Sequence, residues 1–101
     1  MESKPHKTTA NRIAKKLNAN YNDGEGVDIK ANNATVEVET PESVSDAPGQ
    51  LRGYLGPVYI AGTNQKAVNK ALERTQGTTI GVMDNQGTIK KRSTRKKRKG
   101  R

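Results

Sequence analysis

The spacing of apolar residues predicts that the chain begins with an amphipathic helix. Four apolar residues recur every three to four positions, which places their side chains on one face of a helix. They are Ala10, Ile13, Ala14 and Leu17. Thr8 or Thr9 can cap this helix, and the glycine- and asparagine-rich stretch 20–26 ends it. We expect residues 1–7 to be disordered and His6 to be exposed to solvent.

Two runs that alternate apolar and polar residues, 27–30 and 36–39, predict a pair of half-buried strands. Asn32–Asn33 lies between them, and asparagine tolerates the positive φ angles that a two-residue hairpin turn requires. We therefore expect an antiparallel hairpin in which Asp28 pairs with Glu37. The valines and the isoleucine of both runs then share the side that faces the core.

The rest of the pattern predicts alternating helices and strands. The expected elements are a short helix over Gln50–Leu55, a doubly buried strand over Val58–Ala61, a helix over 64–75, and strands over 78–84 and 88–89. Strand–helix–strand units imply parallel pairing. The expected fold class is therefore α/β, with a small mixed β-sheet, made of the hairpin and the strand–helix–strand units, flanked by helices.

Charge is distributed unevenly along the 101 residues. Nine lysines or arginines and no acid fall in 90–101, whereas residues 1–89 hold ten basic and ten acidic residues. The basic segment has no apolar residue to bury, so we expect a disordered basic tail over 90–101 after a single domain over 8–89. Apolar residues make up only 30% of the chain, which predicts a small core.

Several classes of protein are excluded by the composition. The chain contains no cysteine, which excludes disulfide scaffolds, thiolate nucleophiles and cysteine-ligated metals, and one histidine cannot form a site of two imidazoles. No apolar run approaches the roughly 20 residues that cross a bilayer, and the N-terminus has no signal-peptide stretch. We therefore expect no membrane partner and a cytoplasmic location, in a prokaryotic cytosol or nucleoid.

The predicted hairpin gathers three carboxylates, Asp28, Glu37 and Glu39, on the face opposite its apolar residues. Like charges set opposite each other destabilise a sheet. A bound divalent cation would explain this arrangement, because Mg²⁺ takes oxygen ligands from one or two carboxylates, water and phosphate. The alternative is a solvated strand face on which Lys30 and other basic residues neutralise the acids.

Three short motifs follow one another along the predicted elements. They are Gly-Val-Asp-Ile at 26–29, Val-Glu-Val-Glu-Thr at 36–40 and Gln-x-x-x-Tyr at 50–54. Together they resemble the core of the PD-(D/E)XK, or restriction endonuclease-like, nuclease superfamily, in its RecB-like or Holliday-junction-resolvase-like branch. The resemblance covers residues 8–90. It implies that Asp28 and Glu37 hold Mg²⁺ (or Mn²⁺) beside the scissile phosphate, and that Gln50 and Tyr54, one helical turn apart, lie near the site.

Glu39 departs from the family pattern, which has a lysine at this place to position or activate the attacking water. Some restriction enzymes of the superfamily carry an acid there, and Lys30 shares the face and could supply the ammonium. The catalytic candidates are Asp28, Glu37, Glu39, Lys30, Gln50 and Tyr54, with the three acids as metal ligands. The alternatives are an inactive descendant that only binds nucleic acid and, for Gln50 and Tyr54, a pair that packs within a helix.

The basic tail predicts phosphate contacts with nucleic acid, DNA rather than RNA. Its charged residues are Lys90, Lys91, Arg92, Arg95, Lys96, Lys97, Arg98, Lys99 and Arg101. A nuclear-import signal, an anionic membrane surface or ribosomal RNA would fit the same composition. The sequence thus predicts a metal-dependent nuclease acting on DNA, with a homodimer as a further expectation. A non-catalytic protein that binds DNA or RNA, such as a ribosome- or chromatin-associated factor, is the alternative.

Overall fold

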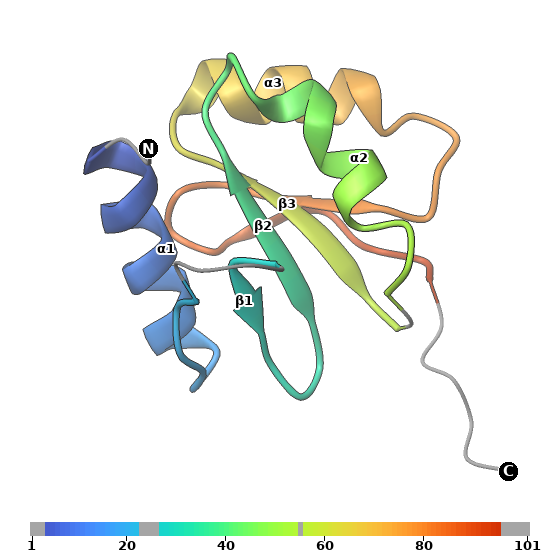
Figure 1. Cartoon of the computed structure of the whole chain (residues 1–101). Coiled ribbons are helices and arrows are strands. Elements are labelled where there is room, and N and C mark those ends of the chain that lie inside the picture. The colour runs from blue at the N-terminus through green and yellow to red at the C-terminus, as the bar shows by residue number, and fades with distance from the viewer. Residues whose placement is uncertain (1–3, 23–26, 55, 96–101) are drawn as a thin grey trace, which may run out of the picture.

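The computed structural model describes residues 4–22, 27–54 and 56–95, which form a five-stranded sheet with helices on both faces (Figure 1). The strands, in sheet order, are β1 (Ile29–Lys30), β2 (Thr35–Glu39), β3 (Val58–Gly62), β4 (Gly81–Met83) and β5 (Ile89–Lys91). The three central strands are parallel, and the two outer strands are antiparallel to their neighbours. The prediction of a small mixed sheet flanked by helices is confirmed.

Two apolar clusters, one on each face of the sheet, form the core. The helical elements are α1 (Lys4–Lys16), the 3-10 turn η1 (Val44–Asp46), α2 (Ala47–Gln50) and α3 (Gln65–Arg74). The apolar residues of α1 pack on one face with the side chains of Ile29 and Val36, whereas α2 and α3 cover Val58 and Ile60 on the other (Figure 1). No helix of the described residues is long and apolar enough to cross a membrane.

Helix α1 begins earlier than predicted. It starts at Lys4, so the expectation of disorder over 1–7 is wrong for residues 4–7, and residues 1–3 lie outside the described residues. Pro5 explains the early start, because its fixed φ suits a first helical turn and its missing N–H is not needed there. The helix ends at Lys16, and Asn18 follows with a φ of 56°, a left-handed conformation that asparagine tolerates.

The predicted hairpin and its register are confirmed. Ile29 lies opposite Val36, and the N–H of Ala31 donates to the carbonyl of Ala34 at 2.8 Å, which closes the turn at Asn32–Asn33. Strand β1 is shorter than the predicted run 27–30, however, because the chain bends at residue 28.

This bend separates two residues that were expected to share a face. Val27 packs in the cluster beneath α2 and α3, whereas Ile29 packs in the cluster beneath α1. Alternation of side chains holds only while the backbone stays extended. The bend therefore places residue 28 where it can contact both sides of the sheet.

The segment predicted as a helix over Gln50–Leu55 folds differently. Helix α2, with Pro48 near its start, ends at the first residue of this segment, and the turn residues 51–53 follow. Gln50 therefore ends the helix, and Tyr54 lies beyond it. The expectation that these two residues share one helical face is wrong.

The C-terminal strand extends into the predicted disordered tail. Side chains alternate beyond Ile89, with Lys91, Ser93 and Arg95 half-buried and residues 92 and 94 exposed. The ammonium of Lys91 donates to the carbonyls of two residues in the α3–β4 region, at 2.6 and 2.9 Å. The prediction of a disordered tail is thus wrong for 90–95, and residues 96–101 lie outside the described residues.

Hydrogen bonds from Arg95 connect this C-terminal segment to the loop after α2. Its Nη1 donates to the carbonyl of Leu51 at 2.7 Å and to the carbonyl of Tyr54 at 2.9 Å, while its Nε donates to the hydroxyl of Thr79 at 3.1 Å. A cation that satisfies main-chain carbonyls in this way stabilises the loop it binds. The loop that follows Gln50 and carries Tyr54 is therefore bonded to the C-terminal segment.

Candidate functional site

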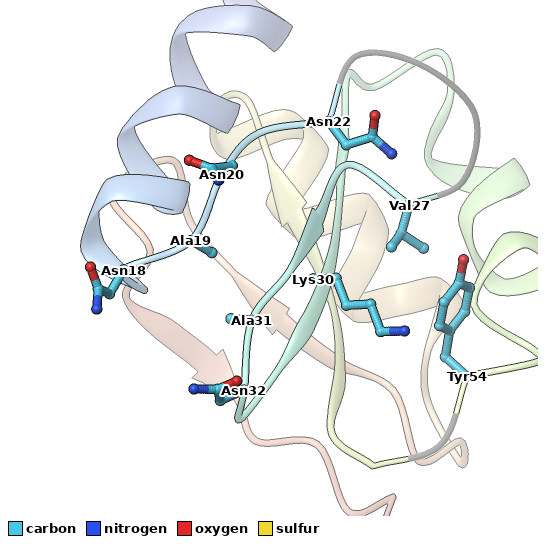
Figure 2. A pocket seen from close by; sticks show the side chains of 9 residues that line it. All are labelled: Asn18, Ala19, Asn20, Asn22, Val27, Lys30, Ala31, Asn32 and Tyr54. Atoms are coloured by element: carbon cyan, nitrogen blue, oxygen red, sulfur yellow. The ribbon is translucent and has the colours of Figure 1, made fainter.

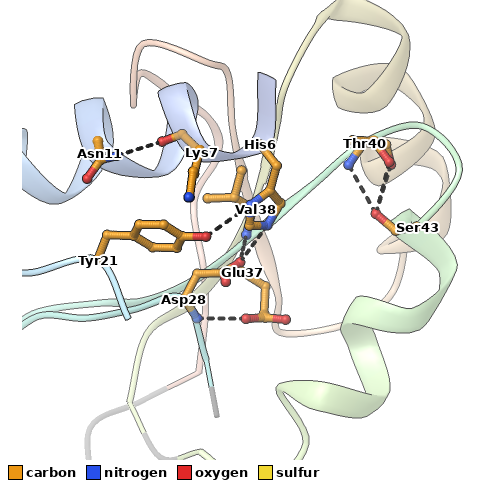
Figure 3. Close-up of polar contacts among 9 residues, drawn as sticks. All are labelled: His6, Lys7, Asn11, Tyr21, Asp28, Glu37, Val38, Thr40 and Ser43. Carbon is orange, nitrogen blue, oxygen red and sulfur yellow. Dashed lines mark hydrogen bonds and ion pairs between the residues drawn. The ribbon is translucent and has the colours of Figure 1, made fainter. Parts of the chain in front are cut away.

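Asp28 and Glu37 lie side by side where β1 parts from β2 (Figure 3). Oε1 of Glu37 accepts a hydrogen bond from the main-chain N–H of Asp28 at 2.8 Å, and Oδ2 of Asp28 accepts one from the N–H of Val38 at 2.8 Å. The side chain of Asp28 thus takes the place of a main-chain partner once the strand has bent away. Asp28 and Glu37 are thus neighbours across the hairpin, as predicted, although residue 28 lies beyond the paired residues of β1. That both side chains share one side of the hairpin stays a prediction.

Helix α1 adds a histidine to this pair (Figure 3). Nε2 of His6 lies 3.2 Å from Oδ2 of Asp28, and the hydroxyl of Tyr21 lies 3.4 Å from Nδ1 of the same ring. The His6 side chain is only 12% exposed, so the prediction of a solvated histidine is wrong. The sequence held a signal for this position, because His6 precedes Ala10 by four residues and so continues the apolar face of α1.

Gln50, the last residue of α2, reaches the acids from the other direction. With its amide nitrogen turned toward them, it donates to Oε2 of Glu39 at 3.1 Å and also to Oε2 of Glu37. The structure therefore brings together four of the predicted site residues, because Glu39 joins Asp28 and Glu37 through this amide. Gln50 lies at the site as predicted, although it reaches the site from a helix end.

Burial controls the protonation of the two glutamates. Glu37 is 4% exposed and Glu39 is 6% exposed. Loss of solvation raises the pKa of Glu37 to about 8, and the adjacent charge of Asp28 adds to the rise. Loss of solvation also raises the pKa of Glu39 to about 7, while a hydrogen bond from Ser43 acts in the opposite direction. Near neutral pH, Glu37 therefore remains largely protonated, and Glu39 is close to the midpoint of its titration.

The short loop after β2 fixes the position of Glu39. The hydroxyl of Ser43 accepts a hydrogen bond from the N–H of Thr40 at 3.1 Å and lies 3.2 Å from the Thr40 hydroxyl (Figure 3). This turn brings the chain from the end of β2 directly into η1 and α2. The carboxylate of Glu39 and the amide of Gln50 consequently face each other across a ten-residue connection.

Lys30 and Tyr54 lie together. The ammonium of Lys30 stands 5.9 Å from the centre of the Tyr54 ring, a cation–π arrangement. Among the described residues, no ion pair joins Lys30 to an acid. No observed contact therefore supports the expectation that Lys30 supplies an ammonium to the acids. Tyr54 contacts Lys30 and does not share a helical face with Gln50.

The donor atoms of the cluster suit one kind of metal. No set of three or more His, Asp or Glu residues in the described part of the chain is arranged as a complete metal-ligand group. Asp28 and Glu37 each use one oxygen on a main-chain N–H, and the Gln50 amide directs its nitrogen at the glutamates, so the cluster offers an ion only carboxylate oxygens. Such an incomplete oxygen set fits Mg²⁺ or Mn²⁺, which keep several waters, and does not fit a structural zinc.

Comparison with protein-family models, with curated proteins and with solved structures gives no match for this chain.

Proposed function

We propose that this chain is a nuclease that hydrolyses phosphodiester bonds of DNA with Mg²⁺ or Mn²⁺. The observation that carries the proposal is the hydrogen-bonded pair of Asp28 and Glu37, buried at the divergence of β1 and β2 with Gln50 directed at the second acid. The assignment to the PD-(D/E)XK superfamily, with its restriction endonuclease-like fold and a RecB-like or Holliday-junction-resolvase-like branch, belongs to this proposal. The element order, a helix, a hairpin and two strand–helix–strand units, supports it.

Asp28 and Glu37 would hold the metal ion, each through the oxygen that does not accept a main-chain N–H. The fixed oxygens orient the two carboxylates before the ion arrives, so little conformational freedom is lost on binding. When bound, the ion lowers the pKa of a coordinated water and offsets charge on the phosphate. Glu39 completes the acidic set from the end of β2.

The Gln50 side-chain amide can interact with the acids Glu37 and Glu39 both when a metal ion is absent and when one is bound. With its nitrogen inward, it donates to Glu37 and Glu39 and so compensates part of their charge. A half rotation about the terminal side-chain bond instead presents the amide oxygen, which is a ligand that Mg²⁺ accepts. Gln50 is therefore the residue whose orientation we expect to report metal binding.

The positive charge of the C-terminal segment is the reason for proposing a nucleic-acid substrate. Exposed cations of the C-terminal segment, such as Lys90 and Arg92, can contact phosphates, as can the basic residues in 96–101 that lie outside the described residues. Lys91 and Arg95 are engaged by main-chain carbonyls, so these two cations do not belong to the proposed phosphate contacts. Action on DNA in the cytoplasm, by a homodimer, is part of the proposal.

A second candidate is a nucleic-acid-binding protein without catalysis. It is favoured by one observation: no lysine occupies the place of Glu39, and Lys30 is directed at Tyr54 rather than at the acids. Such a protein would bind DNA or RNA through the same basic residues and cleave neither.

The experiment that separates the two candidates is a cleavage assay with the full chain. Labelled duplex, single-stranded and branched DNA, and matched RNA, are incubated with Mg²⁺, with Mn²⁺ and with a chelator. The nuclease proposal predicts cleavage that the chelator and Glu37→Gln abolish and that Glu73→Gln, a change of an exposed acid on α3, preserves. Binding without cleavage of any substrate would support the second candidate, and cleavage that survives Glu37→Gln would contradict the proposed site.

A further inference from the structure

A hollow of about 390 Å³ lies along the outer edge of β1 (Figure 2), and its lining includes Val27 and Lys30, which flank Asp28 and Ile29 in the sequence. We call it the asparagine pocket. Its polar lining residues are Asn18, Asn20, Asn22, Asn32, Lys30 and Tyr54. Sites for small ligands commonly have volumes of about 300–1,000 Å³, so the pocket is of a size to take one nucleotide and not a duplex.

The lining offers three kinds of group that bind a nucleotide. The ring of Tyr54 is a surface for stacking, and the ammonium of Lys30, which points toward that ring, is a partner for a phosphate (Figure 2). Asparagine amides carry a donor and an acceptor side by side, which matches the edges of the bases. Among residues 4–22, 27–54 and 56–95, no carboxylate lines the pocket, so these walls do not repel a phosphate.

Main-chain hydrogen bonds fix the walls of the pocket and connect it to the acids. The N–H of Ala19 donates to the carbonyl of Ala14 at 2.8 Å, and Tyr21 forms a bridge with Ile29. The N–H of Asn22 donates to the carbonyl of Asp28 at 2.7 Å, so one wall is bonded directly to a residue of the acid pair. A ligand in the pocket would thus lie near the main chain of Asp28, in a site that exists before binding.

We propose that the asparagine pocket holds one unpaired nucleotide adjacent to the scissile phosphate, with its base against Tyr54 and a phosphate near Lys30. The proposal rests on the proposed nuclease function, because it assigns the pocket to the substrate of the acid pair. A base inside a duplex is stacked on both faces and paired at its edge, so it must leave the stack to reach an aromatic ring. The substrate class is therefore nucleic acid that contains an unpaired nucleotide, such as a bulge, flap or branch.

The test compares a duplex that carries one bulged 2-aminopurine with the same duplex fully paired, using the full chain in the presence of a chelator. Base stacking on an aromatic side chain corresponds to about a 5- to 150-fold change in affinity. We expect the bulged duplex to bind at least about fivefold more tightly, and Asn20→Ala and Lys30→Gln to remove most of that difference. Asn11→Ala, an exposed asparagine of α1 outside the pocket, should preserve it.

Tyr54 needs a separate pair of variants because it also packs against the core. Tyr54→Phe keeps the ring and should keep the preference, whereas Tyr54→Ala should lose it together with the quenching of 2-aminopurine. Equal affinity for the bulged and the paired duplex would overturn the proposal, as would competition by deoxyribose 5-phosphate as strong as that by deoxyadenosine monophosphate, since the base would then contribute nothing.

The outcome is distinguishable from that of the nuclease proposal. Preference for the bulge without any metal-dependent cleavage would support the pocket and contradict the nuclease. Metal-dependent cleavage without preference for the bulge would support the nuclease and overturn the pocket.

Discussion

Charged side chains make hydrogen bonds with the main chain in two regions of the molecule: the acids of the hairpin and the cations of the C-terminal segment. On the hairpin, Asp28 and Glu37 each accept one main-chain N–H, and the remaining charge is crowded together. In the C-terminal segment, Lys91 and Arg95 donate to the carbonyls of four different residues. The first region brings like charges into contact, and the second gives each charge oxygen partners.

This difference assigns different roles to the two regions. A cation surrounded by carbonyl oxygens is satisfied, so its charge stabilises the fold and is not available to a ligand. The buried carboxylates of the hairpin also have hydrogen-bond partners, but burial and the adjacent charge of Asp28 raise the pKa of Glu37 to about 8. A cation from solution would relieve that cluster. The comparison therefore assigns structural support to the C-terminal segment and favours the hairpin as the place of the proposed chemistry.

The largest expected effect is on cleavage, through the acid pair. Asp28→Asn keeps the shape of the side chain and removes the charge that would hold an ion. Because replacement of even an indirect partner of a metal commonly lowers activity about 10- to 100-fold, we expect the loss of cleavage to exceed about 100-fold. Affinity for DNA without metal should stay the same or rise, since repulsion of the phosphates falls. Single-turnover cleavage and fluorescence anisotropy measure the two effects.

Glu39→Lys sharpens the same comparison, because it restores the residue that the resemblance expects. If Glu39 is a metal ligand, this change abolishes the cleavage of the wild type. If the wild type is inactive because the lysine is missing, the change introduces cleavage. Unaltered cleavage would show that Glu39 has neither role.

Truncation separates the structural from the binding cations of the C-terminal segment. Removal of 96–101 keeps every hydrogen bond of Lys91 and Arg95 in place and removes five positive charges. We expect weaker DNA binding and a log–log salt slope that is smaller by about 0.9 for each phosphate that the protein ceases to neutralise. Removal of 90–101 should in addition lower the melting temperature. An unchanged salt slope after the shorter truncation would contradict the assignment of these charges to DNA.

Lys91→Met tests the structural role of a single cation. The change keeps the apolar stem and removes the donor to the Thr75 and Ile80 carbonyls. The expected loss is about 1–3 kcal/mol of unfolding free energy, measured by chemical denaturation. Lys90→Met is the matched control, because Lys90 is exposed and only approaches Asp84 at 3.8 Å, so its effect should stay within about 0.5 kcal/mol. Equal effects of the two changes would contradict this role.

A smaller effect concerns pH. The pKa of Glu37 rises from 4.5 to about 8 on folding, and that of Glu39 rises to about 7. The folded state then binds more protons than the unfolded state above pH 4.5, so the free energy of unfolding falls as pH rises from about 4.5 to 8. In a chelator, we expect the melting temperature to decrease over this range, and less so in Glu37→Gln. Parallel pH profiles for the two proteins would contradict the raised pKa of Glu37.

The parts of the fold that could be predicted from the sequence are those with a local cause. Asn32–Asn33 specifies the hairpin turn, and the turn specifies which residues of the two strands are opposite each other. The helix after β3 is likewise marked by Asn64, whose side chain accepts from the N–H of Ala67 at 2.9 Å. The hairpin register brings Asp28 and Glu37 near each other, so their proximity was predictable, whereas the bend at residue 28 was not.

The wrong predictions concern places where tertiary contacts override local pattern. No apolar periodicity marks the segment of Lys91 and Arg95, because their charged groups are satisfied by carbonyls from distant parts of the chain. The placement of His6 depends on the packing of α1 against the hairpin, which no short motif encodes. Tyr54 does not share a helical face with Gln50, because α2 ends at Gln50 and not at residue 55 as predicted. Each of these placements depends on neighbours that are far away in the sequence.

The most direct test of the central claim is the binding of Mn²⁺ to the acid pair. Titration of the full chain at pH 7.5, followed by electron paramagnetic resonance of the free ion, should show a bound Mn²⁺ that competes with Mg²⁺. Glu37→Gln should abolish this binding, and Glu73→Gln should leave it unchanged. Absence of binding by the wild type, or equal binding by Glu37→Gln, would contradict the claim that Asp28 and Glu37 form a metal site.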